Sequence, residues 1–394
     1  MESNAMTLSM KKLNSGFSLT EMMVAMVIGL IVLAGVSSVM VSNKKSYTAQ
    51  DSLARLQENA RTAMMILSYD LRNVGYMGCN TDRQNWKSVL KTAASGASPV
   101  FSIDPLLEGS TAGGNWLPSN MGLGQLLSAT PKANTDLIMI RGLDTSQPFG
   151  LLRPMNQQSA SMQIVEDSGI QDGEILAITD CDSTDIFQAT NVNKAGGFDN
   201  LIHNTGGSTS PGNRKVGNPP GAKLNKSYGT DAKLMRFKSN IYYIAPSQSG
   251  SGEPALFRQA LVSSSSNSSP QQQELVEGIE NLQVLYGVDQ NGDRMPDTYV
   301  KSNLIAGSSW NNVVSVRFGI IARALANLQT TDLKTAATVG QLDTKDLDID
   351  GDGVIDFDHT DNSLSTTSAS GKTVDDRQYQ RRMFRTTILF RNLQ

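Results

Sequence analysis

The sequence predicts an α+β fold in which a long N-terminal α-helix packs on a mainly antiparallel β-sheet with large loop insertions. The segment from Met22 to Ser42 holds no charged residue, and apolar side chains recur at steps of three and four as far as Val74. Further along, strand-like segments alternate with clusters of Gly, Ser, Asn and Pro, and no regular helices separate them. The chain of 394 residues, 39% of them hydrophobic, is long enough to build a substantial core.

The uncharged segment is long enough to cross a membrane. At 1.5 Å per residue, about 21 helical residues cover a hydrocarbon layer of about 30 Å. Lys11 and Lys12 precede it and favour a cytoplasmic N-terminus. An ordinary secretory signal would be cut near residues 34–38, whereas a lipoprotein signal would need a cysteine in place of Val36. The residues just before the segment point to a third interpretation.

Those residues, KKLNSGFSLTEMMVAMVIG, resemble the leader of type IV prepilins. In that family a prepilin peptidase cuts on the cytoplasmic side of the apolar segment and N-methylates the new N-terminus. The resemblance implies cleavage after Gly16, with Phe17 as the first mature residue and the helix retained. It divides the chain into a prepilin leader (1–16), a transmembrane or filament-core half of the helix (17–42), an amphipathic half (43–74) and a periplasmic or extracellular globular domain (75–394).

Glu21 is a carboxylate at the start of this helix. An ionisable side chain inside a bilayer costs about 2–3 kcal/mol even on lenient scales, so we interpret Glu21 as functional. The resemblance implies that it pairs with the N-terminal amine of its own or a neighbouring subunit when helices assemble into a filament. A second interpretation, a position at the headgroup boundary, stays open.

The spacing predicts one helix from about Phe17 to Val74, about 87 Å long, which Gly75 ends. Its second half presents an apolar stripe to the globular domain. We expect strands at residues 137–140, 174–179, 234–244, 255–262, 282–288, 313–321 and 384–390. Three polar tracts, 191–230, 263–273 and 362–371, have the composition of loops.

Two further phrases resemble PilW-type minor pilins: DLRNVGY (Asp70 to Tyr76), followed by Gly78 and Cys79, and VEGIENLQVLYGVDQNGD in the stretch around residues 274–297. The resemblance implies a non-enzymatic minor pilin that takes part in pilus assembly and twitching motility. Such a subunit is anchored in the bacterial inner membrane and then incorporated into the extracellular pilus, in a tip or priming complex. The implied partners are other minor pilins, the major pilin, prepilin peptidase, the inner-membrane assembly platform and a tip adhesin.

Three other functions compete with this interpretation. A minor pseudopilin of type II secretion shares the leader and the helix, and an adhesin or DNA-uptake subunit could share the anchor. The net charge of -3 opposes nucleic-acid binding. A hydrolase is disfavoured because the two histidines, His203 and His359, have no nucleophile motif nearby.

Cys79 and Cys181 are the two cysteines of the chain, and both follow the predicted anchor. Because that side of the membrane is oxidising, we predict a disulfide that closes a loop of about 100 residues. Two separate buried thiols are the alternative.

An acidic segment predicts a structural Ca²⁺ site. Carboxylates at alternating positions with a glycine at the turn can curl around one hard cation, as in D-x-D-x-D-G-x-x-D loops. The candidate ligands are Asp346, Asp348, Asp350, Asp352 and Asp356. A solvated acidic turn is the alternative.

A second, weaker calcium candidate comprises Asp289, Asn291, Asp293 and Asp297. Arg294 stands where the glycine belongs, so a hairpin turn competes with a metal site there.

Overall fold

The computed structural model describes most of the chain after residue 17, namely residues 18–80, 82–91, 99–103, 105–123, 126–156, 159–205, 209–215, 224–264, 267–325, 348, 365–367, 373–375 and 380–392. Its contacts divide the chain into two units, Met1–Ser52 and Leu53–Gln394. The long helix α1 (Leu19–Arg72) contributes residues to both units.

In the first unit, α1 exposes its apolar side chains. Every large apolar side chain from Leu19 to Val41 is more than half exposed. Within the described part of the chain, α1 is the one helix long and apolar enough to cross a membrane, with a peak mean hydropathy of 2.6. The predicted apolar helix is therefore confirmed over these residues.

In the second unit, α1 buries one face. Leu56, Ala60, Ala63, Leu67 and Leu71 are each at most 1% exposed, and they recur at the helical spacing of three and four residues. They belong to one core with side chains of β5 (Asp136–Leu143), β12 (Lys233–Pro246), β15 (Ile279–Val288) and β17 (Val313–Arg323). The apolar stripe expected from the sequence is thus the face that packs on the sheet.

The helix ends at Arg72, and two residues turn the chain away from it. The side-chain amide of Asn73 donates to the carbonyl of Tyr69 at 2.9 Å. Gly75 has a φ of 72°, which L side chains rarely adopt, and its N–H donates to the carbonyl of Arg141 at 3.0 Å. Gly75 therefore fastens the chain to β5, three residues beyond the last helical residue.

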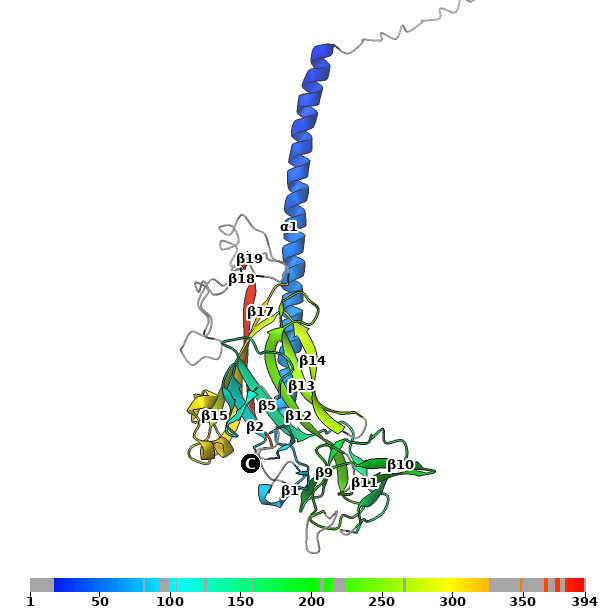
Figure 1. Cartoon of the computed structure of the whole chain (residues 1–394). Coiled ribbons are helices and arrows are strands. Elements are labelled where there is room, and N and C mark those ends of the chain that lie inside the picture. Colours follow the sequence, from blue (N-terminus) through cyan, green and yellow to red (C-terminus); the bar gives the residue numbers. More distant parts are fainter. Residues whose placement is uncertain are drawn as a thin grey trace, which may run out of the picture. The chain divides into compact units, whose positions relative to one another are not determined.

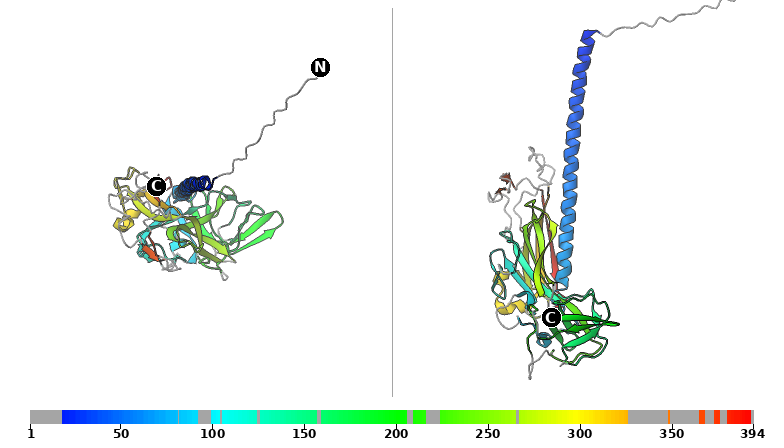
Figure 2. Two further views of the ribbon diagram at one scale, coloured as in Figure 1. Left: turned by 90° about the horizontal axis from the view of Figure 1, so that it is seen from above. Right: turned by 45° about the vertical axis from the view of Figure 1, so that its right-hand side comes forward.

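A nine-stranded sheet forms the centre of the second unit. Its order is β1-β9-β8-β12-β13-β14, and β5 and β6 pair with β12, while β2 pairs with β5. All these pairs are antiparallel except β1 with β9. Figure 1 shows β12, β13 and β14 side by side, and Figure 2 gives two further views. The remaining strands of this sheet are β1 (Trp86–Ser88), β2 (Leu107–Thr111), β6 (Phe149–Gly150), β8 (Ile175–Thr179), β9 (Thr184–Gln188), β13 (Pro254–Ser264) and β14 (Asn267–Glu277).

Smaller sheets complete the described fold. A four-stranded antiparallel sheet has the order β16-β15-β17-β20, and a three-stranded sheet has the order β10-β11-β7. Two two-stranded sheets pair β3 with β4 and β18 with β19. The bounds are β3 (Asn115–Trp116), β4 (Met121–Gly122), β7 (Ser161–Ile164), β10 (Asn191–Ala195), β11 (Phe198–Ile202), β16 (Thr298–Val300), β18 (Ser365–Thr367), β19 (Thr373–Asp375) and β20 (Arg381–Leu389), with short 3-10 helices at Arg83–Asn85, Pro99–Phe101, Ser302–Leu304 and Gly307–Asn312.

The mainly antiparallel sheet is confirmed, but all three tracts expected as loops contain strands. Residues 191–230 begin with the hairpin of β10 and β11, residues 263–273 hold the start of β14, and residues 362–371 contain β18. β14 is polar, yet its backbone pairs with β13 from Asn267 to Glu277. A strand of this kind gains its stability from ladder hydrogen bonds, which composition does not reveal.

Alternation along β12 distributes its side chains between two cores. Tyr242 and Ile244 join the core beneath α1, whereas Ile241 and Tyr243 join a second core with Trp86 and other side chains. A third core contains Phe187, Leu201 and Tyr228, around β8, β9 and β11.

Candidate functional site

Gly16 and Phe17, the predicted processing residues, lie outside the described residues, whereas Glu21 is on the first turn of α1. The Glu21 carboxylate accepts hydrogen bonds from the N–H of Ser18 at 3.0 Å and its hydroxyl at 3.1 Å. The Ser18 hydroxyl oxygen in turn accepts from the N–H of Glu21 at 3.2 Å. This reciprocal arrangement is a capping box, and the S-x-x-E spacing in the sequence could have revealed it.

The capping box gives Glu21 a local partner within the single chain. It satisfies free N–H groups at the helix start and holds the carboxylate at that end of α1. Because Phe17 directly precedes Ser18, the carboxylate lies close in sequence to the amine that processing would create.

The predicted disulfide is confirmed: Cys79 and Cys181 are bonded, with a Cα–Cα distance of 4.8 Å and a sequence separation of 102. It joins the segment that follows α1 to the turn between β8 and β9.

The same junction is held by hydrogen bonds. The hydroxyls of Thr179 and Thr184 donate to the carbonyl of Met77 at 3.1 and 2.9 Å. Gly78 has a φ of 91°, and a Cβ there would lie 2.5 Å from the Thr179 hydroxyl oxygen, so a larger residue would not fit.

The weaker calcium candidate is a described loop after β15. The Asp289 carboxylate accepts from the N–H groups of Gly292 at 2.7 Å and Arg294 at 2.8 Å. Partial desolvation acts to raise the pKa of Asp289, but these backbone donors outweigh it, so the pKa is lowered and the carboxylate stays charged. Arg294 has a φ of 69° at the turn where the sequence pattern would prefer glycine.

The other candidate ligands lie in the same loop. Asn291 donates to Asp297 at 3.1 Å, and Asp297 also accepts from the N–H of Gln290 at 2.7 Å. The loop's polar side chains are thus brought together, but they bond to the loop itself. Within the described residues, no group of three or more His, Cys, Asp or Glu side chains is arranged to hold a metal ion.

Most of the stronger calcium candidate lies outside the described residues. Asp348 is described, whereas Asp346, Asp350, Asp352 and Asp356 are not. A calcium site there stays a prediction.

Of the two histidines, His359 is outside the described residues and His203 is in the interior, 1% exposed. The His203 ring lies 5.2 Å from that of Phe187, and burial lowers the pKa of His203 to about 4. His203 is therefore a neutral core side chain near pH 7.

The sequence did not reveal a buried ion-pair network centred on Glu280 of β15. Glu280 is fully buried and bonds to Arg381 of β20 at 2.5 Å, to Arg323 of β17 at 3.4 Å and to Lys132 at 3.4 Å. Burial acts to raise the pKa of Glu280, but these cations, with Arg381 first, lower it to about 2. The network ties together three strands of the four-stranded sheet, and no local pattern marks such a partnership.

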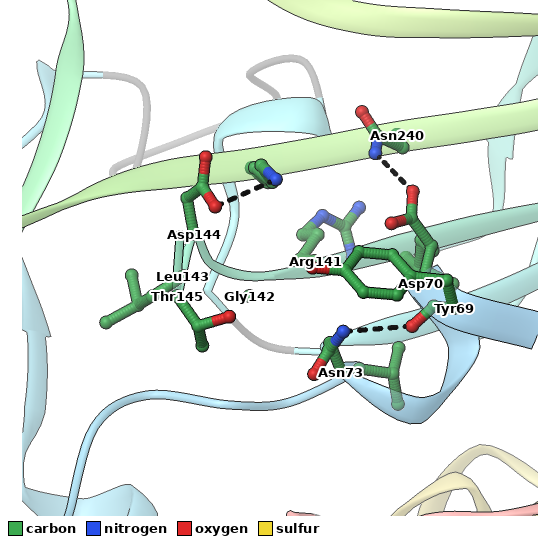
Figure 3. A pocket seen from close by; sticks show the side chains of 12 residues that line it. Tyr69, Asp70, Asn73, Arg141, Gly142, Leu143, Asp144, Thr145 and Asn240 are labelled. Atoms are coloured by element: carbon green, nitrogen blue, oxygen red, sulfur yellow. Dashed lines mark hydrogen bonds and ion pairs between the residues drawn. The ribbon is translucent and has the colours of Figure 1, made fainter. Parts of the chain in front are cut away.

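The DLRNVGY segment lines a small cavity of about 30 Å³ at the last turn of α1 (Figure 3). Asp70 accepts from the side-chain amide of Asn240 at 2.8 Å and from the Tyr242 hydroxyl. On the other side of the cavity, Lys238 pairs with Asp144 at 3.0 Å. Asp70 therefore fastens the end of α1 to β12.

Comparison with known families adds two matches. Residues 241–392 match the family model of the Type IV Pilus-assembly protein W, and residues 11–37 match the Prokaryotic N-terminal methylation motif. No curated protein and no solved structure matches. The first match runs from β12 to the end of β20, and the second contains Gly16, Phe17 and Glu21. Over these two stretches the chain is therefore similar to the Type IV Pilus-assembly protein W family and to proteins with a prepilin-like N-terminus, and the exposed apolar helix lies where the second match places its motif.

Proposed function

We propose that this chain is a minor pilin of a type IV pilus. In this proposal α1 holds it in the bacterial inner membrane, with the unit from Leu53 onward in the periplasm, before it is incorporated into the pilus. The observation that carries the proposal is the run of exposed apolar side chains from Leu19 to Val41. Exposure of such an apolar surface to water is unfavourable, and lipid or the helices of other subunits can cover it.

We place the subunit in a tip or priming complex with other minor pilins. The unit from Leu53 to Gln394 is large for a protein that must fit between closely wound neighbours. A bulky subunit fits more easily at the end of a filament than within its shaft. Its further partners in this proposal are the major pilin, prepilin peptidase, the assembly platform and a tip adhesin.

Substitution of Glu21 tests its proposed role in filament assembly. In Glu21→Ala, leader cleavage and membrane insertion should persist, but the amount of the protein in sheared pili should fall at least about tenfold, since one buried ammonium would lose its partner. Glu58→Ala is the control, because Glu58 is exposed on the same helix and lies outside the capping box. Immunoblots of membranes and sheared pili measure both quantities. Normal incorporation of the Glu21 variant would refute the pairing.

Purification with bound partners distinguishes a pilus subunit from a minor pseudopilin of type II secretion. Other minor pilins and the major pilin should copurify, and immunogold labelling should mark filament ends. Recovery of type II secretion pseudopilins in their place would replace this proposal.

We also propose a structural Ca²⁺ at the Asp346–Asp356 segment, with the loop of Asp289 as a second site. The spacing of oxygen ligands supports the first site, and the convergence of Asp289, Asn291, Asp293 and Asp297 supports the second. The ion would neutralise carboxylates that otherwise repel one another.

Single substitutions distinguish the two calcium sites. Millimolar CaCl₂ should raise the melting temperature of the full chain in neutral detergent, and Asp350→Ala should reduce that gain. Asp293→Ala tests the second loop in the same way, and the exposed Glu166→Gln is the control. If Asp350→Ala responds to calcium as the unaltered chain does, the first site is wrong.

A further inference from the structure

A second and larger cavity lies beside the last turn of α1. It measures about 380 Å³ and shares Tyr69, Asn73 and Thr145 with the small cavity of Figure 3. This volume falls within the range of roughly 300–1,000 Å³ that is typical of ligand pockets. It is open to solvent and lies entirely within the unit that starts at Leu53.

The DLRNVGY segment and the residue before it divide into two groups. Three residues stabilise the fold. Asp70 accepts a hydrogen bond from Asn240, Leu71 packs in the core beneath α1, and the N–H of Gly75 donates to β5. Tyr69, Arg72 and Tyr76 line the larger cavity, and Tyr76 also bonds to Leu143 of β5 through its carbonyl.

Within the described residues, the polar ends of these three side chains have no partner, although the Tyr76 ring packs against the second core. Tyr69 is 54% exposed and Arg72 is exposed as well. Within the described chain, the Arg72 guanidinium makes no ion pair, and neither phenol hydroxyl makes a hydrogen bond. A favourable interaction of Arg72 with the helix dipole explains a basic residue at this position, but not the two tyrosines beside it.

The opposite wall comes from the far end of the sequence. Arg391 and Asn392 follow β20, and the Asn392 amide donates to the carbonyls of Arg72 and Val74, each at 3.5 Å. Among the described residues, the cavity is therefore lined by two arginines, Arg72 and Arg391, and by no acidic side chain, in a chain whose net charge is -3.

We propose that this cavity binds an acidic peptide segment of a partner protein. A planar guanidinium matches a carboxylate with two parallel hydrogen bonds, and tyrosine adds apolar contact together with a polar tip. Arginine and tyrosine are also the residue types that dominate protein–protein contacts. This site does not depend on the proposed place in the pilus.

Acetylated hexaglutamate amide is the probe, and acetylated hexaglutamine amide is its uncharged match. Both are titrated into the full chain in neutral detergent at low salt, with binding followed by calorimetry. The acidic peptide should bind measurably more tightly, and its affinity should fall as salt is added.

Arg72→Gln should weaken hexaglutamate binding by about tenfold, the scale of one well-placed interfacial contact. Tyr69→Ala should weaken it as well. Arg61→Gln is the matched control, because Arg61 is exposed on the same helix and does not line the cavity. Unchanged melting temperatures show that each variant is folded.

Two results would overturn the proposal. Equal losses in Arg72→Gln and Arg61→Gln would mean general electrostatic attraction. Binding of phosphatidylglycerol vesicles that Arg72→Gln abolishes, without binding of the acidic peptide, would mean a lipid surface.

Discussion

Two buried titratable side chains, Asp185 and His203, lie in or against the core formed by Phe187, Leu201 and Tyr228. Asp185 accepts from the Tyr228 hydroxyl at 2.9 Å and from the N–H of Asn225 at 2.7 Å. Its other carboxylate oxygen, like Nε2 of His203, is buried and has no hydrogen-bond partner among the described residues. Both groups are therefore most stable in this core in their neutral forms.

The pKa shifts of these two groups act in opposite directions on stability. Burial raises the pKa of Asp185 from 3.8 to about 6, so its contribution to stability is lost as the pH rises through this window. Burial lowers the pKa of His203 from 6.5 to about 4, so its contribution is lost as the pH falls through that window. Each amounts to about 3 kcal/mol, so the two nearly cancel between pH 6 and pH 4.

Single substitutions should expose each contribution. As the pH falls from 6 to 4, the free energy of unfolding of Asp185→Asn should decrease relative to that of the unaltered chain. Over the same fall in pH, the free energy of unfolding of His203→Gln should increase relative to that of the unaltered chain. Urea unfolding at several pH values measures both slopes, and the comparison removes the contribution of the other carboxylates. Parallel pH profiles for all three proteins would contradict this account.

At the scale of elements, the junction between α1 and the large sheet is the most constrained region. The chain that leaves α1 is held by the Gly75 bond to β5, by the two threonine hydroxyls on the Met77 carbonyl and by the disulfide. The buried face of α1 and the strands beneath it therefore form one cooperative body.

Removal of the disulfide should be costly. A cross-link that closes a loop of about 100 residues stabilises by up to about 4.7 kcal/mol in the chain-entropy model, and the native value is typically 2–5 kcal/mol. The double substitution Cys79→Ser and Cys181→Ser should lower the melting temperature to that of the reduced native chain. A reducing agent should then have no further effect on the variant. Equal melting temperatures with and without the cross-link would show that the hydrogen bonds suffice.

At the scale of the whole molecule, the boundary at Ser52 separates two kinds of surface. Before it, α1 is apolar and exposed, which suits lipid or helices of other subunits. After it, the apolar residues of the same helix are buried in the chain's own core.

A chain that begins at Leu53 should therefore fold without the apolar segment. It retains Leu56, Leu67 and Leu71, so we expect a monomeric protein with a cooperative thermal transition in size-exclusion and circular-dichroism measurements. A chain that begins at Gly75 loses these side chains and should aggregate or fail to fold. Cooperative folding of the shorter chain would show that α1 is dispensable for the core.

Local sequence features determined much of this fold and part of its candidate sites. The helix follows from spacing at three and four residues, and the strands 137–140, 282–288 and 313–321 follow from apolar runs. The disulfide follows from the expectation that both cysteines lie on the oxidising side of the predicted anchor. The capping box of Ser18 and Glu21 was also readable, because its partners are three residues apart.

Only the tertiary structure decided the long-range partnerships. The polar strand β14 is held by pairing with β13, and Glu280 pairs with a cation on another strand. Arg391 lines the same cavity as Tyr69 and Arg72, although it lies far from them in sequence. The helix and the strands were predictable because their spacing involves residues close together in the sequence. The disulfide was predictable because it needs only two cysteines and an oxidising environment. Which distant groups meet is set by sheet order and packing, a property of the folded chain as a whole.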